Sequence, residues 1–239
     1  MRGNDFETGI WHPNESDYEI MLDRLEKLFP KNYRAGNILL LNADCMEVLK
    51  ELKGNEFDLA IVDPPFGLGD KLTIGGTWAA KWTREDSAWD VKPTQEYFNE
   101  LMRVSDAQII WGGNYFSLPP SRCFLIWDKV AHMDTLADCE MAWTSFDKNA
   151  KIFKHIRNST DTRIHLCQKP VKLYDWLLTN YAEKGQKILD THGGSFSSAI
   201  AAHYFGVEYV GIEIDEDYFE AGVVRVKEQT KQIDLFRQG

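Results

Sequence analysis

The sequence has few cysteines, and none lies close to another. The four residues, Cys45, Cys123, Cys139 and Cys167, form no Cys-x-x-Cys motif. This spacing argues against both a zinc site and a disulfide framework, and we expect no bound metal. The chain also lacks an apolar run long enough to cross a membrane and a signal-peptide pattern at its polar amino terminus. We therefore expect a cytoplasmic protein that does not associate with a membrane.

Positive charge is scarce as well. The chain has 27 Lys and Arg against 37 Asp and Glu, which gives a formal net charge of −10. This balance argues against a general nucleic-acid coat protein. The bases are nevertheless segregated, because residues 148–172 contain seven Lys or Arg and one acid, whereas residues 208–220 contain six acids and no base. A basic strip suits a phosphate backbone, and a solvated charged face is the alternative.

The order of the expected elements predicts the fold class. With 239 residues and 44% hydrophobic residues, the chain is long enough for one large α/β domain. Segments typical of strands and helices alternate, which predicts a Rossmann-like, doubly wound and mostly parallel sheet. The expected strands are 37–42, 57–62, 107–111, 123–127, 186–189 and 207–212, and the clearest expected helices are 16–29, 94–104, 171–182 and 215–231. Residues 140–146 and 150–156 are expected to form a hairpin.

The most informative segment is residues 57–67, where an apolar run leads into Asp63, Pro64, Pro65 and Phe66. The prolines end the strand and fix the turn at its carboxyl end, where open α/β sheets bind ligands. A carboxylate and a backbone carbonyl there can accept the two N–H groups of an exocyclic base amine. The neighbouring ring can stack on a base that has been flipped out of a duplex. Taken alone, the segment also fits a plain proline turn with an exposed acid.

A second ligand-binding pattern lies nearer the carboxyl terminus. A strand ends in Asp190 and is followed by a turn rich in glycine and serine and by a helix of small residues. Glycine allows a backbone to approach a ligand closely, as in the cofactor half of a Rossmann-like sheet. Glu213 lies 23 residues after Asp190, near the ~20 residues expected for an acid that binds ribose hydroxyls. S-adenosylmethionine and NAD both fit, but the turn lacks the spaced glycines that a dinucleotide pyrophosphate requires.

Four motifs together resemble one family. Asp63-Pro64-Pro65-Phe66, Gln168-Lys169-Pro170, Asp190…Gly194-Ser195 and Gly211-Ile212-Glu213 occur in this order. The set resembles the β-class of DNA amino-methyltransferases, the N6-adenine and N4-cytosine methylases, and in particular their phage-type members. In that class the catalytic half precedes the half that binds S-adenosyl-L-methionine. The resemblance covers the chain from about residue 37 to its end.

The resemblance implies an activity and a set of site residues. The implied reaction is site-specific transfer of methyl from S-adenosyl-L-methionine to N6 of a flipped adenine in double-stranded DNA. The residues that would hold the base are Asp63, Pro64, Pro65 and Phe66. The residues that would bind the cofactor are Asp44, Asp63, Lys169, Pro170, Asp190, His192, Gly194, Ser195 and Glu213. From the sequence alone, Asp44 is equally well read as the cap of the following helix.

Other functions stay open at this stage. N4-cytosine methylation is the alternative on the same scaffold, although the cytosine enzymes usually carry serine where this chain has Asp63. A non-catalytic relative that binds DNA or cofactor is less favoured. Methylation of protein glutamine or RNA is disfavoured, because those enzymes usually carry Asn-Pro-Pro-Tyr and place the cofactor half first. The resemblance does not decide whether the chain forms a homodimer or serves a cognate restriction endonuclease.

The resemblance also divides the chain and suggests where DNA binds. Residues 1–36 are expected to be a helical extension, and residues 37–239 the methyltransferase domain. Within that domain we expect a catalytic half at 37–128, a DNA-recognition insert at about 129–162 and a cofactor half at 163–239. The expected DNA contacts lie on an aromatic loop and on the basic strip: Lys71, Trp78, Lys81, Trp82, Arg84, Lys148, Lys151, Lys154 and Arg157.

The glycine turn departs from the family pattern Asp-Pro-Phe-x-Gly-Ser-Gly. Thr191, His192 and Phe196 replace the proline, the phenylalanine and the second glycine. We expect Phe196 to place a large side chain near the cofactor. We also expect His192 and Cys167 to be neither metal ligands nor nucleophiles.

Overall fold

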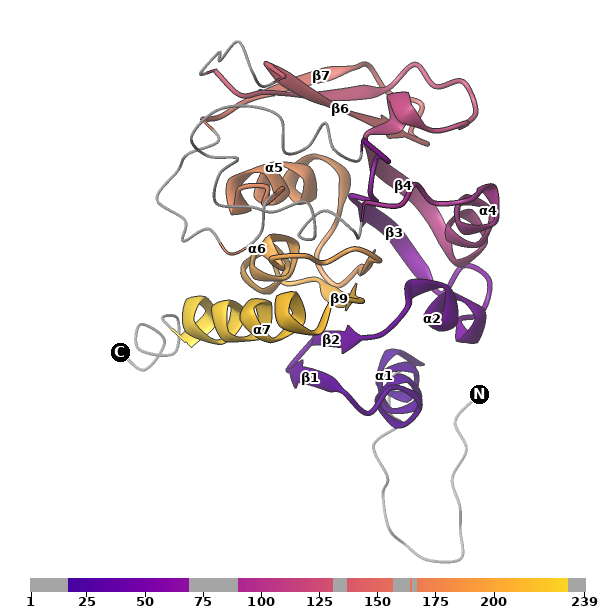
Figure 1. Cartoon of the computed structure of the whole chain (residues 1–239), viewed down its shortest axis with the longest axis vertical. Helices are drawn as coiled ribbons and strands as arrows, with labels where there is room; N and C mark the ends of the chain where they lie inside the picture. Colours follow the sequence, from indigo (N-terminus) through magenta and orange to yellow (C-terminus); the bar gives the residue numbers. More distant parts are fainter. Residues whose placement is uncertain (1–16, 69–89, 131–136, 157–163, 165–166, 232–239) are drawn as a thin grey trace, which may run out of the picture.

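The computed structural model describes residues 17–68, 90–130, 137–156, 164 and 167–231 (Figure 1). Within these residues one mixed sheet has the strand order β1-β2-β9-β8-β3-β4-β6-β5-β7. The strands are β1 (Asn32–Ala35), β2 (Ile38–Asn42), β3 (Phe57–Val62), β4 (Ser105–Trp111), β5 (Phe124–Asp128), β6 (Cys139–Thr144), β7 (Lys151–Lys154), β8 (Lys187–Asp190) and β9 (Glu208–Glu213). The helices are α1 (Asp17–Leu28), α2 (Cys45–Glu51), α4 (Gln95–Val104), α5 (Val171–Tyr181), α6 (Ser197–Phe205) and α7 (Glu216–Thr230), with a 3₁₀ turn η3 (Gly113–Tyr115).

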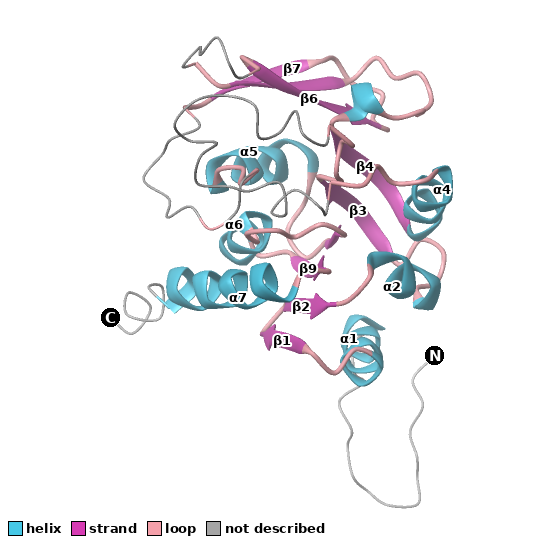
Figure 2. Ribbon diagram, viewed as in Figure 1, coloured by secondary structure: helices cyan, strands magenta, loops and turns pink. Residues whose placement is uncertain are grey.

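The predicted fold class is confirmed. The five central strands β2, β9, β8, β3 and β4 are parallel to one another. Antiparallel pairing occurs toward the edges, where β1 pairs with β2 and where β6 pairs with both β4 and β5. Helices connect most of the parallel strands, so the sheet is doubly wound and Rossmann-like (Figure 2). None of the described helices is both long and apolar enough to cross a membrane.

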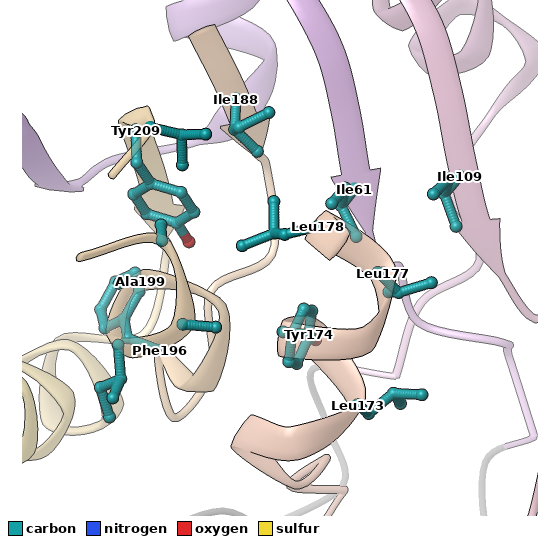
Figure 3. Close-up of a cluster of buried hydrophobic side chains, with 14 of the residues drawn as sticks. Ile61, Ile109, Leu173, Tyr174, Leu177, Leu178, Ile188, Phe196, Ala199 and Tyr209 are labelled. Atoms are coloured by element: carbon teal, nitrogen blue, oxygen red, sulfur yellow. The ribbon is translucent and has the colours of Figure 1, made fainter. Parts of the chain in front are cut away.

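The sheet separates two layers of core. Helices α5, α6 and α7 cover one face, and α1, α2 and α4 cover the other (Figure 1). Strand β3 is buried on both faces, as its continuous apolar sequence predicts. Its Leu59 and Ile61 belong to the layer that contains α5, whereas Ala60 and Val62 belong to the opposite layer. Figure 3 shows Ile61 beside Leu177 and Leu178 of α5.

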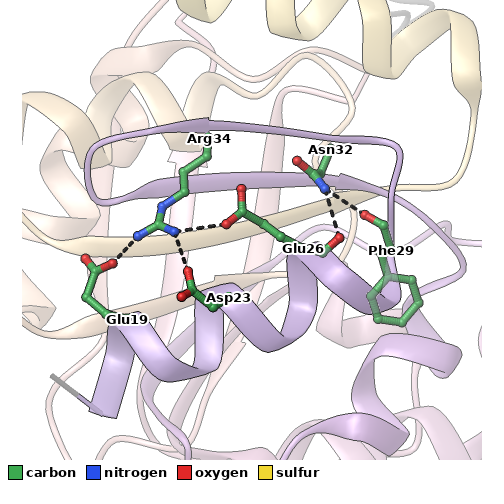
Figure 4. Close-up of polar contacts among 6 residues, drawn as sticks. All are labelled: Glu19, Asp23, Glu26, Phe29, Asn32 and Arg34. Atoms are coloured by element: carbon green, nitrogen blue, oxygen red, sulfur yellow. Dashed lines mark hydrogen bonds and ion pairs between the residues drawn. The ribbon is translucent and has the colours of Figure 1, made fainter. Parts of the chain in front are cut away.

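The helix of the expected amino-terminal extension packs against the sheet. Residues on one side of α1, including Leu22 and Leu25, are fully buried in the layer that contains α2 and α4. Strand β1, which the sequence did not predict, adds an edge to the sheet. Arg34 of β1 binds carboxylates of α1, among them Asp23 and Glu26 at 2.9 Å each (Figure 4). These pairs are partly exposed, so each contributes at most about 1 kcal/mol.

The predicted hairpin of residues 140–146 and 150–156 is wrong. Both segments contain strands, β6 and β7, but β5 lies between them in the sheet. Both edges of β6 are already occupied, because Ala142 pairs with Trp111 of β4 and with Leu125 of β5. The free edge at this end of the sheet therefore belongs to β5, and β7 pairs with β5 in parallel.

Phe196 lies in the core and not on the edge where a ligand would bind. Its side chain is fully buried, and its backbone keeps the left-handed conformation of a glycine, with φ of 52°. The ring occupies space that three glycines leave open. A Cβ added to Gly193, Gly211 or Gly222 would lie 2.1, 2.9 or 2.5 Å from a ring atom. The Phe196 ring thus lies beneath the glycine turn and has no exposed surface there with which to contact a ligand (Figure 3).

This packing predicts an unusual response to Gly222→Ala in helix α7. Replacing glycine by alanine inside a helix normally stabilises a protein by up to about 1 kcal/mol. Here the new methyl group would meet the Phe196 ring, and we expect destabilisation by about 1–3 kcal/mol. Denaturant unfolding measures the difference. Val224→Ala, at a position 53% exposed on the same helix, is the control and should change stability by less than about 0.5 kcal/mol. A Gly222→Ala protein as stable as the wild type would contradict this account.

Candidate active site

Four acidic residues follow one another along the carboxyl edge of the parallel strands. Asp63 comes directly after β3, Asp190 ends β8, Glu213 ends β9, and Asp44 comes two residues after β2. These strands are neighbours in the order β2-β9-β8-β3. Residues that are up to 169 positions apart in sequence (Asp44 and Glu213) are thus brought to the same edge. This is the edge at which open α/β sheets bind ligands.

Asp63 belongs to a buried ion network of four residues, Asp63, Lys169, Glu140 and Lys129. The Lys169 ammonium pairs with Asp63 Oδ2 and lies 3.0 Å from Glu140 Oε2. Lys129 Nζ lies 2.9 Å from Glu140 Oε1. The Lys169 side chain is only 3% exposed. The sequence motif placed Lys169 beside a cofactor pocket, and the structure adds this direct contact with Asp63.

The environment of the network sets its protonation. Burial raises the pKa of the Asp63 carboxyl, and the charge of Lys169 opposes this rise. Although burial also acts on Glu140, the ammonium groups of Lys169 and Lys129 hold the pKa of Glu140 at about 2. The two carboxylates therefore differ, because among the described residues Glu140 contacts two lysines and Asp63 contacts one. Asp63 is the more basic carboxylate of the two.

One oxygen of Asp63 has no partner among the residues that the structure describes. Asp63 Oδ1 is buried and accepts no hydrogen bond from any described residue. A buried acceptor without a donor costs about 1–3 kcal/mol. Such a cost is often retained at functional sites. The orientation set by Lys169 on Oδ2 thus leaves Oδ1 able to accept an N–H group from a ligand.

Aromatic rings lie beside this carboxylate. Phe66 stacks on Tyr115, with ring centroids 5.0 Å apart and ring planes 17° apart. The approach requires Gly112, since a Cβ there would lie 2.2 Å from Phe66 Cε1. Tyr115 is 40% exposed and forms the outer ring of the stack. Sequence reasoning missed Tyr115, although the Gly-Gly-Asn-Tyr-Phe segment after β4 was a signal for a ligand-side turn.

Glu213 is held by backbone N–H groups. Gly194 N donates to Oε2 at 2.7 Å, and Asp215 N donates to Oε1 at 2.9 Å. Burial raises the pKa of Glu213 to about 7. Asp44 follows β2, the strand next to β9. It is exposed, and its Oδ1 accepts a hydrogen bond from Met46 N, so Asp44 caps α2. The other carboxylate oxygen of Asp44 accepts no hydrogen bond from a described residue in this cap.

Some residues of the glycine turn are buried and others are partly exposed. Asp190 is buried and accepts from His192 N at 3.1 Å and from Ser198 Oγ at 2.6 Å. Burial raises the pKa of Asp190 to about 6. Ser195 is also buried, whereas His192 and Gly194 are half-buried. Asp190 and Ser195 therefore shape the turn from within, and His192 and Gly194 lie at its surface.

His192 replaces the usual aromatic residue of the turn and is uncharged. Its Nδ1 lies 2.9 Å from Thr191 Oγ1, which lies 2.6 Å from the hydroxyl of Tyr97. Burial lowers the pKa of His192 to about 4. Thr191 and His192 thus form a polar chain with Tyr97 of α4. Pro170 is likewise structural in part, since it is the N-cap residue of α5.

The donor set fits S-adenosyl-L-methionine. Acids suit the ribose hydroxyls, the adenine amine and the positive charge of that cofactor, and the partly exposed backbone of the turn allows close approach. We propose that Glu213, Asp44, His192 and Gly194 would hold it. Among the residues that the structure describes, no group of three His, Cys, Asp or Glu is arranged to hold a metal ion.

The structure divides the basic strip between two edges of the sheet. Strand β7 runs parallel to β5, so Lys154 lies toward the same edge as Asp63. Lys151, at the other end of β7, bonds Asn180 at 2.7 Å, and Lys148 lies over the rings of Phe146 and Tyr181. The other residues expected to contact DNA, Lys71, Trp78, Lys81, Trp82, Arg84 and Arg157, lie outside the described residues.

Comparisons with known proteins agree on one family. Residues 92–224, more than half of the chain, match the family model for N6/N4 DNA methylases. The chain is 25% identical over 209 residues to the protein YubD of Escherichia coli (strain K12), covering 78% of this chain and 88% of YubD. It is 21% identical over 258 residues to the type II methyltransferase M.ScaI of Streptomyces caespitosus, covering 84% and 85%.

A solved structure shares the fold. The cytosine-N4-specific PvuII DNA methyltransferase superposes with a TM-score of 0.59 and 12% identity, over 85% of this chain and 94% of that one. At this identity the likeness concerns the fold alone.

The raised pKa of Glu213 predicts how ligand binding depends on pH. A ligand that donates hydroxyl groups to Glu213 favours the carboxylate, so binding near pH 7 should release a proton. We expect S-adenosyl-L-methionine to bind more weakly as the pH falls from 8 to 6, by up to about tenfold per pH unit below 7. Calorimetric titration measures this change. Glu213→Gln cannot ionise and should bind weakly at both pH values. Equal wild-type affinity at pH 6 and 8 would count against this role.

Proposed function

From the premise that this chain belongs to the DNA methylase family and uses S-adenosyl-L-methionine, we propose that it methylates N6 of adenine in double-stranded DNA. The observation that carries the proposal is Asp63 Oδ1, a buried acceptor at the carboxyl end of β3 to which no described residue donates a hydrogen bond. Beside it stand the stacked rings of Phe66 and Tyr115. Together they suit a flat base whose amine points at a carboxylate.

The chemistry follows from the nature of the amine. The lone pair of an exocyclic amine is delocalised into the ring, so the nitrogen is planar and a poor nucleophile. When its N–H groups donate to Asp63 Oδ1 and to the carbonyl of Pro64, the nitrogen is drawn toward tetrahedral geometry. The positive charge that develops on the nitrogen is stabilised by the same two acceptors. S-adenosyl-L-methionine, when bound, supplies a methyl group already activated by its sulfonium.

Asp63 is suited to this role by its basicity. A carboxyl whose pKa is raised by burial accepts hydrogen bonds more strongly and takes up a proton more readily than an exposed one. Lys169 keeps the charge of the buried carboxylate compensated through Oδ2. The side chain can thus remain ionised while Oδ1 faces the amine.

The choice of adenine rests on the resemblance of the motif. Asp-Pro-Pro-Phe is the form that the adenine enzymes of the class usually carry, and the cytosine enzymes usually have serine first. Cytosine N4 offers the same kind of amine to the same acceptors. Nucleoside analysis of the product separates the two bases.

The first experiment is transfer of labelled methyl from S-adenosyl-L-methionine to unmethylated double-stranded DNA, followed by nucleoside analysis. We expect N6-methyladenine, and we expect Asp63→Asn to lower turnover by about 10²–10³-fold or more. The variant loses the carboxylate charge, and Lys169 holds the remaining amide oxygen at the position of Oδ2, away from the target amine. Binding of the cofactor should persist in this variant. Asp58→Asn is the matched control, since Asp58 lies at the opposite end of β3 and bonds only Lys187 N among the contacts seen there.

The outcomes separate the alternatives. N4-methylcytosine in the product would overturn the assignment of the base and keep the role of Asp63. Near-normal turnover by Asp63→Asn would overturn the role of Asp63. A wild-type protein that binds the cofactor and transfers no methyl to DNA would overturn the proposed reaction.

We further expect the two ends of the basic strip to contribute differently to DNA binding. Lys154 lies toward the edge that carries Asp63, and Lys148 lies toward the opposite edge. Lys154→Gln should weaken binding to a DNA duplex and reduce the salt dependence of log K by about one phosphate contact. Lys148→Gln, which removes the same charge, is the control. Fluorescence anisotropy at several salt concentrations measures both, and equal losses would contradict this assignment.

A further inference from the structure

The buried ion network contains two residues that the proposed reaction does not use. Glu140 lies on β6 and Lys129 directly follows β5, and both are far from Asp63 in sequence. Neither residue belongs to the motifs that locate the site. Lys129 is only 8% exposed at its side chain, and Glu140 22%. Burying charges is costly unless each has a close partner. A buried network of four charged residues is therefore expected to have a structural or functional role.

The contacts form a line from Asp63 to Lys129. Lys169 touches one oxygen of Asp63 and one oxygen of Glu140, and Lys129 touches the other oxygen of Glu140. Two carboxylates and two ammonium groups alternate, so the network has no net charge when all four are ionised. The register Trp127↔Glu140 and the antiparallel pairing of β6 with β4 and β5 fix the position of Glu140.

We propose that Glu140 is a positioning residue for the proposed methyl transfer: by sharing Lys169 with Asp63, it holds the lysine on Oδ2 and keeps Oδ1 available to the target amine. Lys129 balances the charge of Glu140, so that the pair orients Lys169 without altering the charge around Asp63. This inference rests on the proposed function. It assigns Glu140 and Lys129 a role through Lys169 and no contact with the substrate.

The geometry predicts what each removal does. Without Glu140, two ammonium groups face one carboxylate, and Lys169 is free to bind both oxygens of Asp63. Without Lys129, two carboxylates share one lysine, and part of the attraction between Lys169 and Asp63 is lost. The first change should make Asp63 less basic and the second should make it more basic. Removing both leaves a neutral pair of Asp63 and Lys169.

Other titratable groups near Asp63 do not produce this pattern. Asp190 of β8, Tyr97 of α4 and Tyr174 of α5 interact electrostatically with Asp63. Burial raises the pKa of both tyrosines well above the ordinary value, so they stay neutral at the pH values of the experiment. Asp190 is present in every variant and shifts all of them alike. An opposite response of two single variants is therefore specific to the network.

The first test uses the protein without substrate. Carbon-13 NMR of protein labelled at the aspartate carboxyl carbons gives the titration midpoint of Asp63, with Asp63→Asn as the assignment control. We expect the midpoint to fall by about one pH unit or more in Glu140→Gln and to rise in Lys129→Met. The double variant Lys129→Met/Glu140→Gln should titrate close to the wild type. Shifts of the same sign in both single variants, or none, would overturn the proposal.

The second test uses methyl transfer to DNA. We expect Glu140→Gln to lower kcat at least about tenfold, because Asp63 acts in the transition state and loses its orientation. The change in KM for S-adenosyl-L-methionine should be smaller. The acid limb of its pH profile should move to lower pH, and the double variant should move it back. Equal loss of kcat in all three variants with no movement of the profile would mean that the network is only a scaffold.

The two tests keep the proposals apart. Removing one partner of a buried pair can unfold a protein, and the neutral double variant avoids an uncompensated charge. Opposite NMR shifts in a protein that transfers no methyl to DNA would uphold the coupling within the network and overturn the proposed reaction. Methyl transfer by the wild type without opposite shifts would uphold the reaction and overturn the role of Glu140.

Discussion

Burying a carboxylate at the end of a parallel strand is costly unless compensating charge lies close to it. Asp63 meets this condition through Lys169, which enters from the segment before α5 and reaches a strand more than 100 residues earlier in the chain. The same contact fixes which oxygen of Asp63 is engaged. The position of α5, the two prolines after β3 and the antiparallel strand β6 all contribute to this one arrangement. Much of what the site can do chemically depends on it.

The glycine-turn side of the edge depends on close packing and less on charge. The turn between β8 and α6 approaches β9 closely enough for Gly194 N to reach Glu213, and this approach requires glycines where the Phe196 ring would meet a side chain. Phe196 fills the core under the turn while its backbone adopts a glycine-like conformation. A residue that breaks the family pattern thus stabilises the turn from below. The outer surface of the turn keeps its small residues, Gly193 and Gly194.

The sequence allowed the fold class and the family to be predicted, since the motif residues are contiguous and each follows an apolar run of strand length. It did not predict Glu140 and Lys129, because their contact with Lys169 depends on the order of strands in the sheet. The hairpin was wrong for the same reason: local pattern identifies β6 and β7 as strands and does not say which strand lies between them. The orientation of Phe196 depends on Gly211 and Gly222, whose significance appears only when their elements are packed together.

The acids along the carboxyl edge also carry an energetic cost that bears on function. Burial raises the pKa of Asp190 to about 6 and of Glu213 to about 7. For a carboxyl whose pKa is raised in the folded state, the stabilising contribution is complete below the unfolded pKa and is lost as the pH rises through the folded value. Ionisation of these two groups therefore makes the protein without ligand less stable at pH 8 than at pH 5. A cation or a set of hydroxyl donors at this edge would stabilise the ionised carboxylates and offset that loss. Part of the free energy of ligand binding would then come from removing the cost of the buried negative charges.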